Sequence, residues 1–326
     1  AAGLVFVAAL LLATTPPDAL TALDPHAVTR YNLIAGAIGI VSALLVTATS
    51  VVMTRKHPGA SGVALAHTVP FLTAAAALRL SQSHWDTAGW AWTGLGLLIG
   101  SLAVLTLPKR YRISIAAPLV VGTVLAATGL LVRLGQLSQA GVSAILFALI
   151  IVLLQVAPWI ALAHIPVRIL DADTTEQIPA KGITDQVSNS FVFVVALRSG
   201  GAIAAIFLTV SLMTAPETRS VSLPLTLITL GAVSLVLQTR SIRARVEVLL
   251  GALSGLIVIL VATVLGAYAD PRTMPWLTLS AIATALVLVV TNVVGPRARP
   301  HLTRIADTIS VLSLFVLLPL AVYLWS

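Results

Sequence analysis

Long apolar stretches, broken by isolated charges, are the feature that most constrains this chain. Hydrophobic residues make up 58% of its 326 positions and charged residues only 9%, against about 45 to 50% and about 25% in soluble domains. A soluble fold of this length could not cover its surface with so few charges. The mean hydropathy of +1.04 agrees. The sequence therefore predicts a multi-pass membrane protein.

The missing cysteines narrow the chemistry further. With no Cys in the sequence, disulfide scaffolds, thiolate zinc sites, iron–sulfur clusters and thiol catalysis are excluded. The sequence also has no glycine-rich phosphate loop with its lysine, so no means of using ATP is visible. We expect no cofactor.

Apolar stretches of about 17 to 25 residues can cross a hydrocarbon core of about 30 Å as helices. The alternating pattern of a membrane β-barrel is absent. The sequence predicts an all-α integral membrane protein, a bundle of about eleven transmembrane helices filling residues 1–326. The predicted spans are 1–15, 32–53, 62–80, 88–107, 113–132, 140–165, 199–214, 221–238, 246–268, 275–294 and 305–325. The first is short, about 21 Å at 1.5 Å per residue, so we expect its start to precede Ala1.

Lys and Arg are shared unevenly between alternate loops, fourteen in one set and five in the other. The poorer set has one per loop: Arg30, Arg79, Arg133, Arg219 and Arg272. The positive-inside rule places the richer set in the cytoplasm, which predicts a cytoplasmic N-terminus and a periplasmic C-terminus. The net charge of +8 is then a topology signal beside anionic lipid, and no nucleic-acid partner is expected.

One inner loop, residues 166–198, is long enough to form structure outside the membrane. Its acidic cluster of Asp171, Asp173 and Glu176 is a candidate docking surface for cytosolic partners. The apolar residues after Ile183 have helical spacing and fit a short surface helix over 183–197. Equally, this part of the loop can extend the seventh span into the cytoplasm.

Ionisable groups are scarce inside the predicted spans, where a charge costs about 2.5 to 3.5 kcal/mol at the bilayer centre. His67 is the nearest exception, and a neutral imidazole donating to a neighbouring carbonyl is favoured over a proton carrier. The charges placed at span ends are Arg79, Arg133, Arg198 and Asp270. Two outer pairs, Asp24 with His26 and His84 with Asp86, lack a third local ligand, so no metal site is predicted.

Two glycine pairs mark candidate helix-packing surfaces. Gly96 with Gly100 and Gly251 with Gly255 both have the GxxxG spacing, which lets helix backbones approach closely in membranes. We expect packing within the chain in preference to a seam between subunits.

Three stretches carry a family resemblance. They are VAPWIALAHIPV at 156–167, RSIRARVEVLLGALSGL at 240–256, and the ending RPHLTRIADTISVLSLFVLLPLAVYLWS, in which Pro300, Arg304, Asp307 and Pro319 match the closing helix. Together they resemble EccD, the polytopic membrane subunit of mycobacterial type VII (ESX) secretion systems. Ser310 departs from the pattern, because an acidic residue often stands one turn after the closing aspartate in that family.

The resemblance implies a non-catalytic structural subunit of the inner-membrane secretion complex. Its implied partners are a second EccD copy, the ATPase EccC, EccB and EccE, together with membrane lipids. Paired copies would form a helical barrel, and a cytosolic ubiquitin-like domain would precede the first span. Two alternatives stay open: a secondary transporter for a neutral or lipid-like solute, and a membrane-embedded transferase acting on lipid-linked sugar.

Overall fold

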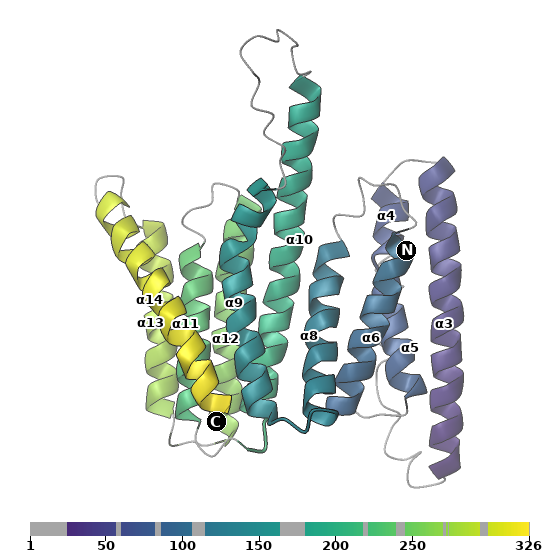
Figure 1. The fold of residues 1–326 in the computed structure, drawn as a ribbon, viewed down its shortest axis with the longest axis horizontal. Coiled ribbons are helices and arrows are strands. Elements are labelled where there is room, and N and C mark those ends of the chain that lie inside the picture. Colours follow the sequence, from purple (N-terminus) through teal and green to yellow (C-terminus); the bar gives the residue numbers. More distant parts are fainter. Residues whose placement is uncertain are drawn as a thin grey trace. The chain divides into compact units, whose positions relative to one another are not determined.

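The structure, a computed structural model, describes residues 25–56, 60–81, 86–105, 115–163, 180–217, 221–238, 245–269, 272, 274–293 and 299–325. The described elements are all helices. The chain divides into two compact units, Ala1–Leu137 and Ser138–Ser326. Figure 1 shows the helices of each unit running side by side.

In unit 1, neighbouring helices pack against one another in pairs. Its helices are α3 (Pro25–Lys56), α4 (Ala60–Ala66), α5 (Val69–Leu80), α6 (Thr87–Val104) and α8 (Ala116–Arg133). The short helix α5 packs against both α3 and α6, and α6 in turn packs against α8. The Ser50 hydroxyl donates to the Gly62 carbonyl at 2.9 Å and ties α3 to the segment that contains α4.

The predicted span 62–80 is divided in two, with His67 and Thr68 between α4 and α5. Pro70 is the cause, because it has no N–H to donate to the carbonyl of Ala66 one turn earlier. The Thr68 hydroxyl donates to the Leu65 carbonyl at 2.7 Å, which gives this polar side chain a partner at the break.

Unit 2 is organised around α9 and α11. Its helices are α9 (Gln139–Ala163), α10 (Ala180–Met213), α11 (Ser222–Gln238), α12 (Arg245–Ala269), α13 (Met274–Val293) and α14 (Arg299–Trp325). Helix α9 contacts α10, α11 and α14, while α11 also contacts α12, α13 and α14. The largest fully buried side chains of this unit are Phe147, Ile151, Leu154, Leu208, Leu212, Leu227, Ile228, Leu235, Leu277 and Leu317.

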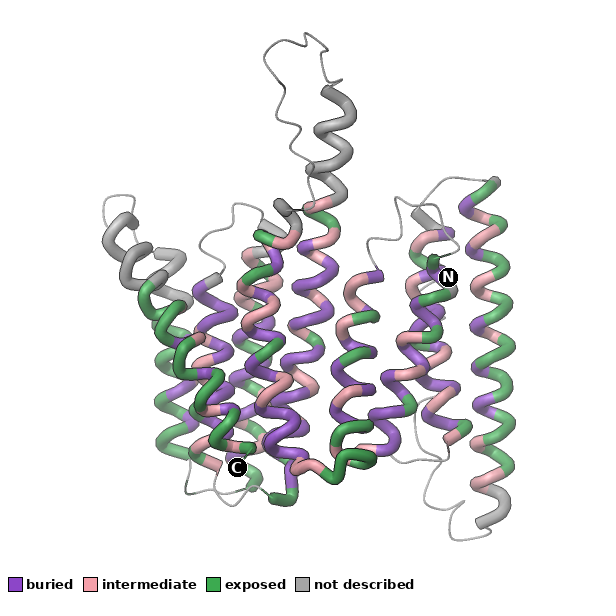
Figure 2. The backbone as a smooth tube through the Cα atoms, in the orientation of Figure 1, coloured by how far each residue is buried: buried purple, intermediate pink, exposed green. Residues whose placement is uncertain are grey.

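Large apolar side chains also cover the outside of both units. Figure 2 shows exposed residues along the outer faces of α3 and α14, and Phe315 and Leu44 on these faces are 74% and 66% exposed. Such surfaces suit hydrocarbon and would be unstable in water. Seven helical stretches are long and apolar enough to cross a membrane, counting only the described residues.

Each predicted span from the second to the last coincides with a helix or, for 62–80, with a helix pair. The first span, 1–15, lies outside the described residues. Within the predicted loop 166–198, the part from Ala180 onward is helical, because α10 is one continuous helix from Ala180. Residues 183–197 thus belong to the same helix as the seventh span and are not a separate surface helix.

Candidate functional site

The first predicted glycine pair lies in the seam between α5 and α6. A Cβ atom at Gly96 would lie 2.6 Å from the Thr73 carbonyl oxygen and 2.7 Å from Ala74 Cα. At Gly100 it would overlap the Thr73 hydroxyl and lie 2.6 Å from Pro70 Cα. The Thr73 hydroxyl is 2.7 Å from the Gly96 carbonyl, so it donates across the seam. Both glycines therefore face a helix of their own chain.

A second seam, between α6 and α8, was missed by the sequence analysis. A Cβ atom at Gly94 would overlap the Ala126 backbone, and one at Gly129 would overlap the backbone of Thr87 and Ala91. Gly122, Ala126 and Gly129 follow one another at helical spacing along α8. A search for small residues three to four apart, in place of two glycines four apart, would have found this seam.

The second predicted glycine pair is unequal in the structure. Gly255 is buried against α11, where a Cβ atom would lie 2.7 Å from Val236 Cγ2 and 2.9 Å from the Ala232 carbonyl oxygen. Gly251 is half-buried, and its carbonyl accepts a hydrogen bond from the Ser254 hydroxyl at 3.0 Å.

Polar side chains join the helices of unit 2 in the bundle interior. Gln139 Nε2 donates to the Ser211 carbonyl at 2.8 Å, and the hydroxyls of Ser143 and Ser211 are 2.7 Å apart. These contacts link α9 to α10. Neutral side chains satisfied in this way hold helices together in lipid without the cost of a buried charge.

Helix α14 is also joined to its neighbours by polar side chains. Ser313 and Ser234 of α11 approach to 2.7 Å between their hydroxyls, and Gln155 Nε2 of α9 donates to the Ser310 hydroxyl at 3.1 Å. Ser310, where the family pattern often has an acid, thus forms a neutral contact with a neighbouring helix.

Two arginines that were predicted to lie at span ends are buried within the protein. Arg79, near the end of α5, is 4% exposed. Its Nη1 donates to Asn32 Oδ1 at 2.9 Å, and its guanidinium lies 5.6 Å from the ring centre of Tyr31. Arg198 is 6% exposed and lies inside the apolar stretch Ser190–Met213. Arg198 was predicted to lie at a span end, and in the structure α10 continues through it in both directions.

His67 has the hydrogen bond expected of it. Its Nδ1 lies 2.7 Å from the Val63 carbonyl oxygen, and because a carbonyl only accepts, this nitrogen carries the proton. Asp86, half of a rejected metal pair, accepts the Gly89 N–H at 2.9 Å where α6 begins. No group of three or more His, Cys, Asp or Glu residues gathers in the described part of the chain. Asp171, Asp173 and Glu176 lie outside it.

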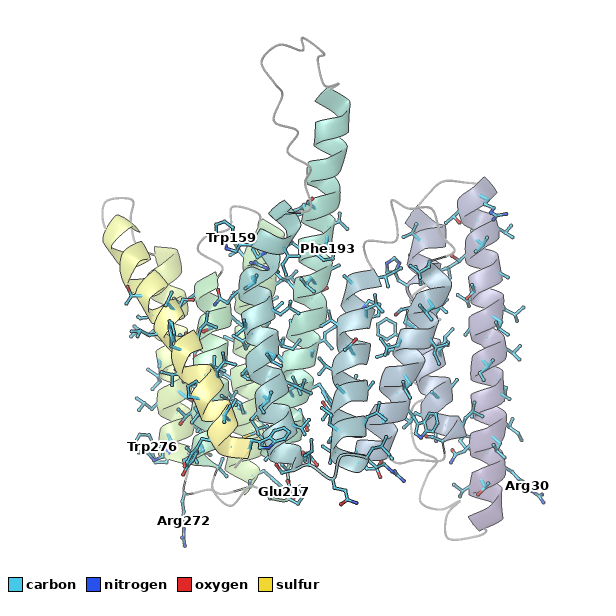
Figure 3. All side chains as sticks on the ribbon, viewed as in Figure 1. Arg30, Trp159, Phe193, Glu217, Arg272 and Trp276 are labelled. Atoms are coloured by element: carbon cyan, nitrogen blue, oxygen red, sulfur yellow. The ribbon has the colours of Figure 1, made fainter. Side chains whose placement is uncertain are left out.

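Aromatic residues mark both ends of unit 2. Figure 3 shows Trp159 toward one end and Trp276 toward the other, the end at which Glu217 and Arg272 also lie. The two tryptophans are 71% and 66% exposed. Tryptophan is enriched where a membrane protein meets the two bilayer surfaces, so these two exposed side chains are candidates for the two interfaces.

The sequence matches the family model described as "EccD-like transmembrane domain" over residues 1–326. The chain belongs to this family. No curated protein matches it. Family membership confirms the resemblance drawn from the three sequence stretches, and with it an all-helical, multi-pass protein of the inner membrane.

Two solved structures share the fold. A structure described as protomer 1 of the ESX-3 core complex has a TM-score of 0.68 at 16% identity, covering 99% of this chain and 73% of the other. A MycP5-free ESX-5 inner membrane complex in state II has a TM-score of 0.58 at 16% identity, covering 87% and 69%. Together with the family match, these folds support a membrane subunit of a type VII secretion system.

Proposed function

We propose that this EccD-like chain is a non-catalytic structural subunit of a type VII secretion complex, in which two copies form a helical barrel in the inner membrane. The observation that carries the proposal is the family match along the whole of residues 1–326. A scaffold needs a bundle that holds its shape without performing chemistry.

The packing of both units is consistent with such a scaffold. Backbone contact at Gly96 and Gly255 fixes neighbouring helices at short distances, which favours one arrangement over many. Buried serines and glutamines are used in bonds between helices, as with Ser143 and Ser211. Polar groups committed to the fold in this way do not converge on a shared substrate position, as a catalytic site requires.

The proposed partners are a second EccD copy, EccB, the ATPase EccC and EccE, with membrane lipids around them. The exposed apolar faces of α3, α12 and α14 offer area to lipids and to neighbouring spans, with Leu260 of α12 58% exposed. The chain brings no visible means of using ATP, so the energy for export would come from the ATPase partner.

Mild detergent extraction of the native complex tests this proposal. We expect the chain to co-purify with large partners, and images of the particles to contain two copies in contact. Purified alone in liposomes, it should neither move a neutral solute nor transfer a lipid-linked sugar. Activity of the isolated chain in either assay would favour the transporter or the transferase and contradict the scaffold.

A further inference from the structure

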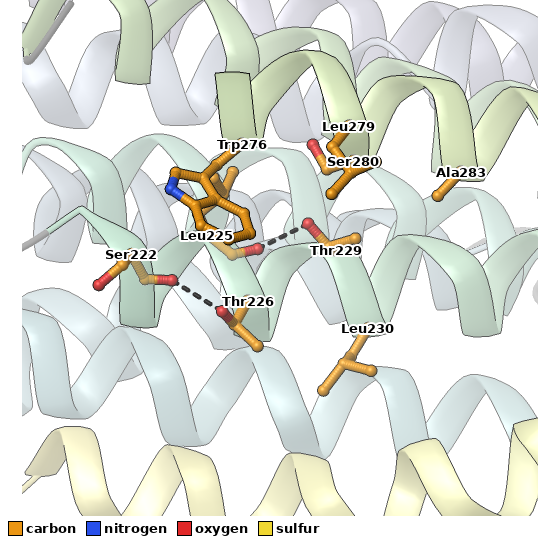
Figure 4. A pocket seen from close by; sticks show the side chains of 9 residues that line it. All are labelled: Ser222, Leu225, Thr226, Thr229, Leu230, Trp276, Leu279, Ser280 and Ala283. Atoms are coloured by element: carbon orange, nitrogen blue, oxygen red, sulfur yellow. Dashed lines mark hydrogen bonds between the residues drawn. The ribbon is translucent and has the colours of Figure 1, made fainter. Parts of the chain in front are cut away.

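A cavity of about 470 Å³ lies between α11 and α13 of unit 2. Figure 4 shows it from close by. Its lining residues are Ser222, Leu225, Thr226, Thr229 and Leu230 on α11, and Trp276, Leu279, Ser280 and Ala283 on α13. The volume lies within the range of about 300 to 1,000 Å³ that is typical of ligand pockets.

The groove runs along two helices that begin at the same end. It starts beside Ser222, the first residue of α11, and Trp276, in the first turn of α13, and it reaches Leu230 and Ala283. Figure 4 shows the residues of both helices in the same order along it. At 1.5 Å per residue, its length along α11 is about 12 Å, so it spans less than half of a bilayer.

The lining is mostly apolar along this length, with hydroxyl groups at Ser222, Thr226, Thr229 and Ser280. The indole of Trp276 lies at the helix starts, and Leu230 and Ala283 lie at the other end. The Thr226 hydroxyl donates to the Ser222 carbonyl at 2.8 Å, and the Thr229 hydroxyl donates to the Leu225 carbonyl at 2.7 Å. With their protons used inside α11, these hydroxyls require nothing from a ligand. The deeper part of the groove therefore suits a hydrocarbon chain.

The charges near the opening suit an anion. The first turns of α11 and α13 hold no acidic residue, and helix N-termini carry partial positive charge. Arg272, exposed, lies two residues before α13. Glu217 is the acidic residue described at this end (Figure 3), and it is five positions before α11. Trp276 is 66% exposed, as expected of a side chain at headgroup level.

We infer that this groove, the α11–α13 groove, binds an anionic phospholipid. One acyl chain lies along Leu225, Leu279 and Ala283, and the phosphate lies at the starts of the two helices near Arg272. A transmembrane helix of a partner is a poorer fit. It would need a groove of about 30 Å, and its axis would have to lie about 8 to 10 Å from each wall helix.

Lipid retention by the full-length protein in detergent tests the inference. The lipids bound per chain are counted by native mass spectrometry after washing and addition of phosphatidylglycerol, phosphatidylcholine or inorganic phosphate. Ala283→Trp and, from the opposite wall, Thr226→Trp fill the groove. Ala285→Trp is the matched control, because Ala285 is an exposed alanine of the same helix that does not line the cavity.

We expect one tightly held phosphatidylglycerol in the unchanged protein and in the Ala285→Trp variant, and at least a tenfold loss of retention in both groove-filling variants. Arg272→Gln should lower the preference for phosphatidylglycerol over phosphatidylcholine about fivefold, whereas Arg133→Gln, another exposed arginine beside a helix end, should not. Melting curves without added lipid identify any variant that fails to fold, and the second groove variant then decides.

Three results would overturn the inference. The first is equal lipid retention in the Ala283→Trp and Ala285→Trp variants. The second is equal retention of phosphatidylglycerol and phosphatidylcholine by the unchanged protein. The third is stabilisation of the protein by inorganic phosphate alone that equals its stabilisation by phosphatidylglycerol. If the groove-filling variants lose a partner subunit while their lipid retention is unchanged, the groove would be assigned to a protein partner instead.

Discussion

At the scale of single residues, the close packing of helices in unit 1 depends on glycines, because glycine has no Cβ atom. The three nearest neighbours of a Cβ atom built at Gly96 are backbone atoms or the first atom of a side chain, namely the Thr73 carbonyl oxygen, Ala74 Cα and Ala77 Cβ. Such atoms cannot rotate away as the end of a long side chain can. A larger residue at this position must therefore move a whole helix.

We predict that Gly96→Leu lowers the thermal stability of the detergent-solubilised chain and reduces secretion. Overpacking a fitted interior costs about 1 to 3 kcal/mol. Ala37→Leu, at an exposed position of α3, controls for the added leucine and should melt like the unchanged protein.

His67→Ala should leave secretion nearly intact, since it removes one local hydrogen bond to Val63. Secretion abolished by the histidine change alone would indicate proton coupling.

The other glycine pair gives a prediction of rank. The GxxxG pattern treats Gly251 and Gly255 alike, but a Cβ atom at Gly255 would press on Val236 and the Ala232 carbonyl, whereas Gly251 is half-buried. We expect both leucine substitutions to reduce secretion, and Gly255→Leu to lower the melting temperature more. Equal melting temperatures for the two variants would mean that the α11–α12 seam relaxes freely.

At the scale of the helix, α14 has a wide exposed apolar surface and two serines, Ser310 and Ser313, that contact neighbouring helices. Only 17% of the residues in its apolar stretch, Thr308–Trp325, are buried. Ser313 meets Ser234, and its hydroxyl also lies 2.8 Å from the Ser310 carbonyl. One proton cannot serve both, so the consistent arrangement has Ser313 donating to that carbonyl and Ser234 donating to Ser313.

The coupling free energy between Ser234 and Ser313 should be small but measurable. A double-mutant cycle of Ser234→Ala and Ser313→Ala is expected to give a coupling of about 0.6 kcal/mol, the mean for hydrogen bonds between membrane helices. The measurement is the unfolding free energy in detergent. A cycle pairing Ser234→Ala with Thr278→Ala, whose exposed hydroxyl bonds within α13, should show no coupling. Equal coupling in both cycles would exclude a specific serine contact.

The positions of the helices could be predicted from the sequence, whereas the faces on which they pack could be predicted only in part. Apolar length predicted helices such as α12 within a residue or two of 246–268, because every backbone group in lipid must be satisfied inside its own segment. At Arg198 the charge indicated a span end, while the helix α10 passes straight through that residue. The seam between α6 and α8 was missed because the GxxxG pattern includes neither an alanine nor a three-residue spacing, and α8 has both at Gly122, Ala126 and Gly129.

At the scale of the whole molecule, the side of the membrane on which each end lies is a prediction from basic residues alone. Fourteen Lys and Arg residues in one set of loops against five in the other favour a cytoplasmic N-terminus. A reporter fused after Ser326 should read as periplasmic, and one inserted near Glu176 should read as cytoplasmic. Finding both on the same side would overturn the count of eleven spans.

The segment before α10 is where this molecule could reach a cytosolic partner. Residues 164–179 lie between α9 and α10, and an extended residue spans at most about 3.5 Å, so this segment can extend well clear of the headgroups. Its acidic cluster of Asp171, Asp173 and Glu176 would be repelled by anionic lipid on the cytoplasmic face. We therefore expect the cluster to project from the membrane toward basic groups of a partner, with the ATPase subunit as the candidate.

Replacing Asp171, Asp173 and Glu176 with Ser tests this docking role. The variant should insert and fold normally, because exposed charge changes usually cost under about 0.5 kcal/mol. Recovery of the ATPase subunit after mild extraction should fall, and in the unchanged protein it should fall as salt rises, because charges exposed to solvent are screened. The variant should have lost that salt dependence. Equal recovery from the two proteins across the salt series would make the cluster a solvated linker and remove it from the interface.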